Sequence, residues 1–294
     1  LEQACRELRQ AGAAAALAVP VDMADQPAVE AAAERVEQAL GPIDVWVNNA
    51  MATVVAPVAQ TQPEDFRRVT DVSYHGFVWG TMAALRRMQA RGSGSIVQVG
   101  SALAYRSIPL QAAYCGAKHA VRGFTDSLRT ELLHEGSPVR LSIVELPGVN
   151  TPQFDWCKTS LDHKPQPLGT VYQPEVAARA IVHAAGGGRS EIYVSWSAAL
   201  TIWAQRAAPR AMDWLIARRA YDGQSSQEPL PPDRPTNLWQ PVPGDVGAHG
   251  RFDARAKAHS TSLWMNLNRS WLIGSAVALA ALGWLARDAG RKQR

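Results

Sequence analysis

Residues 95–118 read SIVQVGSALAYRSIPLQAAYCGAK, in which an apolar run is followed by a helical pattern. The run Ser95–Val99 is typical of a buried strand, and it ends at Gly100 and Ser101. The pattern over Gln111–Leu133 predicts an amphipathic helix. A short apolar strand that leads into a long helix is the repeating unit of a parallel sheet.

The same alternation runs from the N-terminus to about residue 195. Strands are predicted over Leu17–Val21, Val45–Val47, Arg140–Leu146 and Glu191–Val194, and helices over Leu1–Ala11, Gln26–Leu40, Pro63–Ala90 and Pro174–Ala185. We therefore predict the α/β class for residues 1–195, with a doubly wound parallel sheet covered by helices.

The composition changes after residue 195. Residues 196–222 have the spacing of an amphipathic helical segment, interrupted at Pro209. Residues 223–262 are rich in Pro and Gly and are expected to form an extended connector. Residues 263–294 are expected to form a hydrophobic helix followed by a basic tail.

The uncharged run Trp271–Ala286 is interpreted as a membrane anchor. Together with Ser270 it would span about 25 Å as a helix, against about 30 Å for the hydrocarbon core of a bilayer. Tryptophan near both ends, with Arg269 and Arg287 outside them, is typical of a membrane interface. The anchor would be either a short spanning helix or a helix lying in one leaflet. A core helix docked on the domain and a contact between subunits are the alternatives.

Charge is divided unevenly along the chain. The net charge is +4, but residues 251–294 carry +6 and residues 1–250 carry −2. A weakly acidic body argues against a nucleic-acid partner, because phosphate binding needs a basic face. The three widely spaced cysteines give neither a disulfide framework nor a metal-ligand pair, so no metal site and a cytoplasmic domain are expected.

Tyr114 and Lys118 are the first candidates for chemistry. Residues four apart share one helix face, and an ammonium group favours the tyrosinate form, which lowers the pKa of a tyrosine from about 10. Tyr114 is therefore a candidate general acid and base, with Lys118 as the residue that adjusts its pKa. Ligands of parallel sheets bind beyond the carboxyl ends of the strands, where Ser101 is expected to lie.

These motifs resemble the classical short-chain dehydrogenase/reductase family, Rossmann-type oxidoreductases that use NAD or NADP. The matching pieces are VDM around Asp22, VNNA at 47–50, Ser101, YCGAK at 114–118 and PGVNT at 147–151. The resemblance implies that the protein interconverts an alcohol and a ketone or aldehyde. It assigns proton transfer to Tyr114, binding of the substrate oxygen to Ser101 and contact with the nicotinamide ribose to Lys118.

The resemblance also implies where the cofactor lies and what the partners are. Asp22 would contact the adenine, and Asn48, Asn49 and Ala50 would line the adenosine ribose. The nicotinamide carboxamide would be bound by Pro147, Gly148, Val149 and Thr151. These partners are a small alcohol or carbonyl substrate and a second copy of the chain. The predicted C-terminal anchor adds a membrane as a partner, and a membrane setting indicates a lipophilic substrate.

The sequence departs from the family pattern in three places. Ser73 stands where the family has an asparagine, and it is interpreted as either a helix-packing residue or part of a proton relay. Met51 replaces a glycine. The family's first strand, Gly-rich loop and second strand have no counterpart here, so residues 1–195 are interpreted as a partial Rossmann catalytic domain truncated at its N-terminus. The alternative function is a non-catalytic, membrane-bound remnant or binding module.

Overall fold

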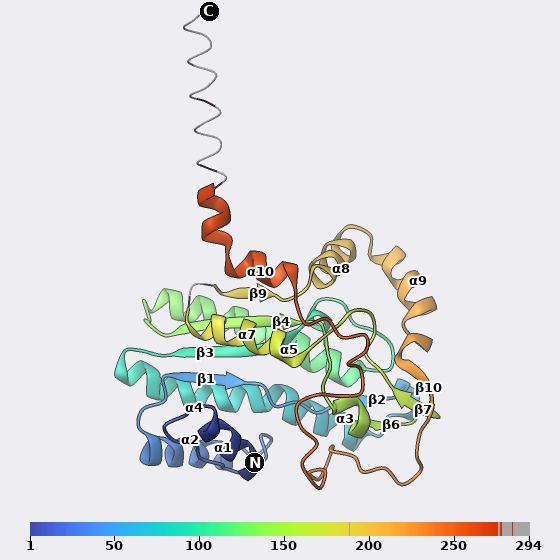
Figure 1. Ribbon diagram of the computed structural model, residues 1–294, viewed down its shortest axis with the longest axis horizontal. Coiled ribbons are helices and arrows are strands. Elements are labelled where there is room, and N and C mark those ends of the chain that lie inside the picture. Colours follow the sequence, from blue (N-terminus) through green and yellow to red (C-terminus); the bar gives the residue numbers. More distant parts are fainter. Residues whose placement is uncertain (188, 276, 278–283, 285–294) are drawn as a thin grey trace, which may run out of the picture.

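A four-stranded parallel sheet forms the centre of the structure, a computed structural model that describes residues 1–187, 189–275, 277 and 284. Its strands lie in the order β1 (Val45–Asn48), β3 (Ser95–Ser101), β4 (Arg140–Leu146) and β9 (Glu191–Tyr193), as Figure 1 shows. Parallel neighbours need a crossover, and helices supply each one here. The predicted α/β class with a parallel sheet is confirmed.

Helices cover the sheet on both faces. Three of them share one hydrophobic cluster: α2 (Gln26–Leu40), α4 (Gly76–Arg91) and α5 (Ala112–His134). Helix α7 (Pro174–Ala185) shares the second cluster. Ile96 of β3 belongs to the first cluster and Val97 to the second, because successive side chains of a strand point to opposite faces. The continuous apolar character of β3 follows from this double burial.

The predicted strand over Leu17–Val21 is wrong. This stretch has no regular structure between α1 (Glu2–Gln10) and α2, and β1 is the last strand on that side of the sheet. A strand needs a hydrogen-bonding neighbour, and none of the described residues pairs with this stretch. The side chain of Asp25 then begins α2 by accepting a hydrogen bond from the amide of Ala28.

The long predicted helix over Pro63–Ala90 is divided by a π-helical turn. Helix α3 (Pro63–Thr70) leads through this turn, Asp71–His75, directly into α4. The turn inserts an extra residue into the helical ladder, which sequence periodicity does not reveal.

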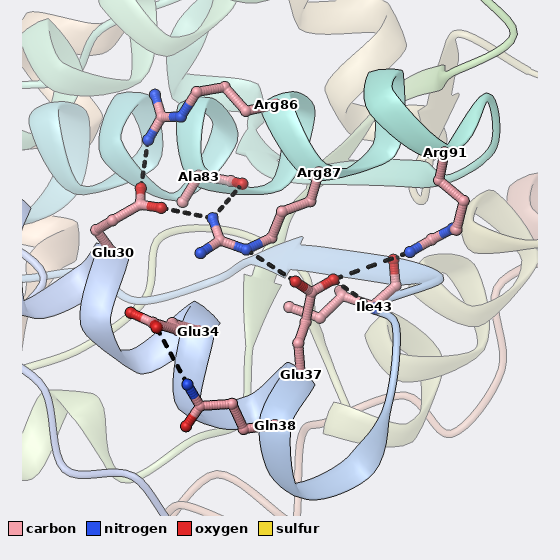
Figure 2. A network of polar contacts seen from close by, with 9 residues as sticks. All are labelled: Glu30, Glu34, Glu37, Gln38, Ile43, Ala83, Arg86, Arg87 and Arg91. Carbon is pink, nitrogen blue, oxygen red and sulfur yellow. Dashed lines mark hydrogen bonds and ion pairs between the residues drawn. The ribbon is translucent and has the colours of Figure 1, made fainter.

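Helices α2 and α4 are joined by a network of charged side chains, shown in Figure 2. Arg87 of α4 contacts Glu30 at 2.6 Å and Glu37 at 3.1 Å, both on α2, and it also donates to the carbonyl of Ala83. Arg86 pairs with Glu30 as well. Because Glu30 and Glu37 lie about two turns apart on α2, these contacts fix α2 against α4, which in turn packs on β1 and β3.

The segment after β9 wraps around the body. Helices α8 (Trp196–Ala207) and α9 (Pro209–Arg219) separate at Pro209, as predicted. The Pro- and Gly-rich stretch that follows is packed against the domain. Strand β10 (Ser225–Pro229) pairs with β7 (His163–Pro165), and Leu238 is buried in a cluster with residues of α3. Helix α10 (Thr261–Leu267) lies against β9.

Short elements complete the described chain. They are β2 (Val54–Val55) paired with β6 (Lys158–Thr159), β5 (Gly148–Val149) paired with β8 (Val171–Tyr172), helix α6 (Gln153–Trp156), and the 3-10 turns Val58–Gln60, Ala102–Ala104 and Asp222–Gln224.

Most of the run Trp271–Ala286 lies outside the described residues. Within the described part of the chain, no helix has the length and apolar character needed to cross a bilayer. The predicted membrane anchor is thus not supported here and stays a prediction.

Candidate active site

A cavity of about 950 Å³ opens beyond the carboxyl ends of β3 and β4. Ser101, Tyr114 and Lys118 line it together with Pro147, Gly148, Val149 and Thr151. Ser101 is the last residue of β3, and the loop from Pro147 follows β4 directly. The topology therefore brings the predicted catalytic side chains and the predicted nicotinamide loop to one place, as expected for the ends of parallel strands.

Local structure positions each of the three candidate catalytic side chains. The Ser101 side chain begins a 3-10 turn by accepting a hydrogen bond of 3.2 Å from the amide of Leu103. Tyr114 and Lys118 lie one turn apart near the start of α5, and the Lys118 Nζ is 5.7 Å from the centre of the Tyr114 ring. Lys118 is buried, and its Nζ donates to the carbonyl oxygen of Val99 at 2.8 Å.

The pKa of Tyr114 differs from the prediction. Burial raises the pKa of this phenol above its ordinary value, because the phenolate loses its hydration, and a hydrogen bond with Ser101 opposes the rise. The pKa of Tyr114 is therefore raised overall, and the predicted net lowering is wrong. Burial also lowers the pKa of Lys118 to about 8, and the negative charge of Glu145 opposes that change.

Residues predicted to contact the adenosine half of the cofactor occupy different surroundings. Asn49 and Ala50 line the cavity, as does Met51. Asn48 is buried beside the cavity, where its amide donates to Thr81 and to Gln98, both at 2.9 Å. Its role in the structure is to hold β1 and β3 against α4.

Asp22 is half exposed and does not line the cavity. It forms an ion pair of 2.8 Å with Arg68 of α3 and accepts a hydrogen bond from the amide of Ala24. Burial raises the pKa of Asp22, but the bonds to Arg68 and Ala24 outweigh it and lower the pKa overall. The predicted adenine contact by Asp22 stays a prediction.

Ser73 has a structural role. It is fully buried in the π-helical turn, and its hydroxyl both donates to the carbonyl and accepts from the amide of Ala52, each at 2.9 Å. The hydroxyl is thereby bound to the backbone after β1, and Ser73 does not line the cavity. Of the two interpretations of Ser73, packing fits the structure.

Residues 1–159 match a family model described as short chain dehydrogenase. The chain belongs to the short chain dehydrogenase family. It is therefore an oxidoreductase of the kind that acts on CH–OH or C=O groups.

Relatives of this dehydrogenase include an uncharacterized oxidoreductase, YxnA, of Bacillus subtilis. The two are 28% identical over 288 residues, which cover 97% of this chain and 80% of YxnA. The human dehydrogenase/reductase SDR family member 7 is 40% identical over 116 residues, covering 40% of this chain and 34% of the human protein.

Solved structures give the same result for the fold. A short-chain dehydrogenase from Streptomyces avermitilis superposes with a TM-score of 0.57 and 25% identity, covering 75% of this chain and 87% of that one. A short chain dehydrogenase from Burkholderia cenocepacia, solved in complex with NADP, gives a TM-score of 0.54 and 27% identity, covering 69% and 80% of the two chains.

One wall of the cavity in this dehydrogenase was not predicted. Helices α8 and α9 supply Thr201, Met212, Leu215, Ile216 and Arg219, and the stretch after β10 supplies Asn237. The signal available in the sequence was the spacing of Met212, Leu215, Ile216 and Arg219 on one helix face. Phe154 and Trp156, which follow the loop from Pro147 to Thr151, also line the cavity.

Proposed function

We propose that this dehydrogenase interconverts an alcohol and a ketone or aldehyde with NAD or NADP. The observation that carries the proposal is the shared cavity of Ser101, Tyr114 and Lys118 with the loop from Pro147 to Thr151. A hydroxyl, a phenol and a buried ammonium facing one apolar cavity can bind a substrate oxygen and exchange a proton with it.

The cavity residues fit the nicotinamide half of such a cofactor. Lys118 and Tyr114 would hold the nicotinamide ribose, and the backbone from Pro147 to Thr151 would bind the carboxamide. Asn49 and Ala50 line the same cavity and would contact the adenosine ribose. When bound, the cofactor supplies or accepts the hydride. The Burkholderia cenocepacia neighbour, solved with NADP, supports this class of cofactor.

Tyr114 would transfer the proton. In reduction its phenol donates to the carbonyl oxygen, and in oxidation the phenolate accepts the proton of the alcohol. The Ser101 hydroxyl would orient that oxygen, and the Lys118 ammonium would stabilise negative charge on the phenol. A phenol is already protonated at neutral pH, as proton donation to a carbonyl requires, and the raised pKa of Tyr114 extends this state to higher pH.

The lining of the cavity supports a lipophilic substrate. Apolar side chains from three parts of the chain face the space beside Tyr114, among them Phe154, Trp156, Met212, Leu215 and Ile216. Burial of apolar surface would supply most of the binding free energy of such a substrate.

Replacement of Tyr114 by Phe tests the mechanism. We expect loss of turnover by about 10²-fold or more on any carbonyl substrate of the wild type, with NADPH or NADH still bound. Tyr105→Phe is the matched control, because Tyr105 does not line the cavity and its hydroxyl faces that of Tyr193 at 3.3 Å. Near-normal turnover in Tyr114→Phe would refute the assignment.

Titration of the 294-residue chain with NADH and NADPH addresses the alternative of a non-catalytic remnant. Binding at micromolar concentration is expected if the chain is an enzyme, whereas a remnant would bind neither cofactor. We also propose that the expected second copy of the chain associates through the long helices α4 and α5, where Met82 and Leu133 are exposed, and light scattering tests this.

A further inference from the structure

Glu145, on the central strand β4, is a buried carboxylate beside the candidate active site. Glu145 is fully buried, and neither of its carboxylate oxygens has a hydrogen-bond partner among the described residues. Burial of a carboxylate without partners is costly, so such a group needs a compensating charge or a role. No part of the proposed mechanism uses it.

The strand register places Glu145 next to Gly100 of β3. These two residues are Cα partners, and a Cβ added to Gly100 would lie 2.5 Å from the Glu145 Oε2. Only glycine leaves room for the carboxylate at this position. Lys118 reaches the same part of β3, since its Nζ donates to the carbonyl of Val99, the residue before Gly100.

Glu145 and Lys118 also share one layer of the fold. Ile143, two residues before Glu145 on β4, packs against Val121 of α5. Side chains two apart on a strand point to the same face, so Glu145 faces α5, the helix that carries Lys118. The carboxylate and the ammonium thus converge on consecutive residues of β3 from within one buried layer, although they form no direct ion pair.

Helix α5 presents three charged side chains at intervals of four residues: Lys118, Arg122 and Asp126. Arg122 lies 3.5 Å from carboxylate oxygens of both Asp126 and Glu191, and 3.8 Å from the centre of the Tyr105 ring, but its buried Nη1 has no hydrogen-bond partner among the described residues. In the described structure, by contrast, Lys118 is hydrogen-bonded only to the Val99 carbonyl. Among the carboxylates, Glu145 is the one whose charge opposes the effect of burial on Lys118, and it interacts with Arg122 as well.

We propose that Glu145 is a positioning residue that keeps Lys118 charged in its buried site. The inference rests on the proposed function, because it concerns the lysine assigned there to the cofactor ribose and to Tyr114. Charges in a dry layer interact over several ångströms without direct contact, since little water screens them. Removal of the carboxylate would leave Lys118 with no negative charge beside it, only the Val99 carbonyl oxygen and the faces of nearby rings, of which Phe77 is 4.3 Å from its Nζ.

The electrostatics of the surrounding groups agree with this role. Burial raises the pKa of Glu145 to about 8, and the positive charges of Arg122 and Lys118 oppose the rise. The carboxyl therefore gains its negative charge over the same pH range in which Lys118, whose pKa is also about 8, would lose its own. Glu145 in turn contributes to the raised pKa values of Tyr114 and, on β9, of Tyr193, though burial is the larger cause in both. For Lys118, the charge of Glu145 is what opposes the effect of burial.

Direct titration of Lys118 tests the proposal without any catalytic assay. The sequence has five lysines, and NMR of the chain labelled with ¹³C at lysine Cε would follow each one, with Lys118→Arg identifying the signal. In Glu145→Gln, we expect Lys118 to titrate at least about one pH unit lower than in the wild type. Glu191→Gln is the matched control, because it removes a carboxylate that contacts Arg122 and should leave Lys118 unchanged. An unchanged Lys118 in Glu145→Gln, or an equal shift in both variants, overturns the proposal.

Kinetics give a second, separable readout. If Lys118 titrates about one pH unit lower in Glu145→Gln, kcat/KM for carbonyl reduction by this variant should match the wild type at pH 6. It should be about fivefold lower than the wild type at pH 8 and about tenfold lower at pH 9. Glu145→Asp should restore part of the loss, because it restores the charge. A loss equal at all pH values, in a variant with the wild-type circular dichroism spectrum, would indicate a merely structural role and contradict the proposal. Failure of the Tyr114→Phe test would not affect the NMR titration, so the two proposals fail independently.

Discussion

The Lys118 Nζ lies 2.8 Å from the carbonyl oxygen of Val99, which ties the start of helix α5 to strand β3. This contact fixes a charged group from one element against the backbone of another, next to Ser101. The three candidate catalytic side chains are thus carried by two rigid elements, β3 and α5. A site held in this way keeps its geometry while substrates enter and leave.

The pH dependence of reduction should follow Lys118. Burial lowers the pKa of Lys118 to about 8, whereas it raises that of Tyr114, so the lysine loses its charge first as the pH rises. We expect kcat/KM for a carbonyl substrate to be constant from about pH 6 to 7 and to fall as the pH passes through about 8. A steady-state pH profile measures this. In Lys118→Arg the decline near pH 8 should vanish, because guanidinium stays charged; a decline in the wild type only above pH 10 would contradict the prediction.

Gly100→Ala should destabilise the protein. The new Cβ would lie 2.5 Å from the Glu145 Oε2 and 2.9 Å from the Ile143 Cγ1, and both neighbours are buried. Overpacking of this kind costs about 1–3 kcal/mol in the free energy of unfolding. Urea denaturation measures the loss. Gly123→Ala, within helix α5, is the control, because a Cβ at Gly123 would have no neighbouring atom within 4 Å. This substitution should stabilise the helix by about 0.5–1 kcal/mol.

Ser73→Ala should be destabilising through hydrogen bonding. The hydroxyl serves both the amide and the carbonyl of Ala52, and the alanine would leave both groups buried without that partner. We expect the free energy of unfolding to fall by about 2 kcal/mol. Ser127→Ala, which removes an exposed hydroxyl on α5, should change it by less than about 0.5 kcal/mol. Equal effects of the two substitutions in thermal melts would show that the Ser73 contacts are weak.

Leu238→Ala should loosen the segment that follows β10. This side chain is fully buried among residues of α3 and β2, although it lies in a Pro- and Gly-rich stretch. Truncation of a buried leucine costs about 2–5 kcal/mol, and exposure of the segment to limited proteolysis should rise accordingly. Val246→Ala, an exposed position of the same stretch, should be neutral. If Leu238→Ala left the rate of proteolysis unchanged, the packing of this segment would not depend on the Leu238 side chain.

Arg87→Met should weaken the contact between α2 and α4, and the effect should depend on pH. Arg87 is mostly buried and pairs with Glu30 and Glu37. Burial raises the pKa of Glu30, but Arg87 and Arg86 outweigh it and lower the pKa overall, so the stability that this pairing provides is present above pH 4.5 and is lost as the pH falls below it. We expect the variant to be about 1 kcal/mol less stable at pH 7 and closer to the wild type at pH 3. Chemical denaturation at the two pH values measures the difference in free energy of unfolding between variant and wild type. A difference of the same size at pH 7 and pH 3 would exclude the ion pairs as its cause.

Local signals in the sequence were sufficient to predict most of the helices and strands. The apolar runs of β3 and β4 and the amphipathic pattern of α5 depend on nearest neighbours along the chain, and so their type and approximate bounds could be predicted. The prediction of a strand over Leu17–Val21 was wrong because a strand needs a neighbouring strand to pair with, and pairing is a non-local property. The π-helical turn at Asp71–His75 was equally invisible to periodicity.

The sequence by itself determined the chemistry available to this protein: a tyrosine and a lysine one helical turn apart, a serine at a strand end and a glycine-containing loop after the next strand. The tertiary structure decided their environment. Packing buries Tyr114 and Lys118 so that their pKa values move, directs Asn48 and Ser73 into hydrogen bonds of the core, and brings α8 and α9 over the cavity. It also places Glu145 beside Gly100, since only the register of two strands distant in sequence can set a buried charge next to the lysine. Desolvation depends on what surrounds a group in three dimensions, and motif spacing carries no information about it.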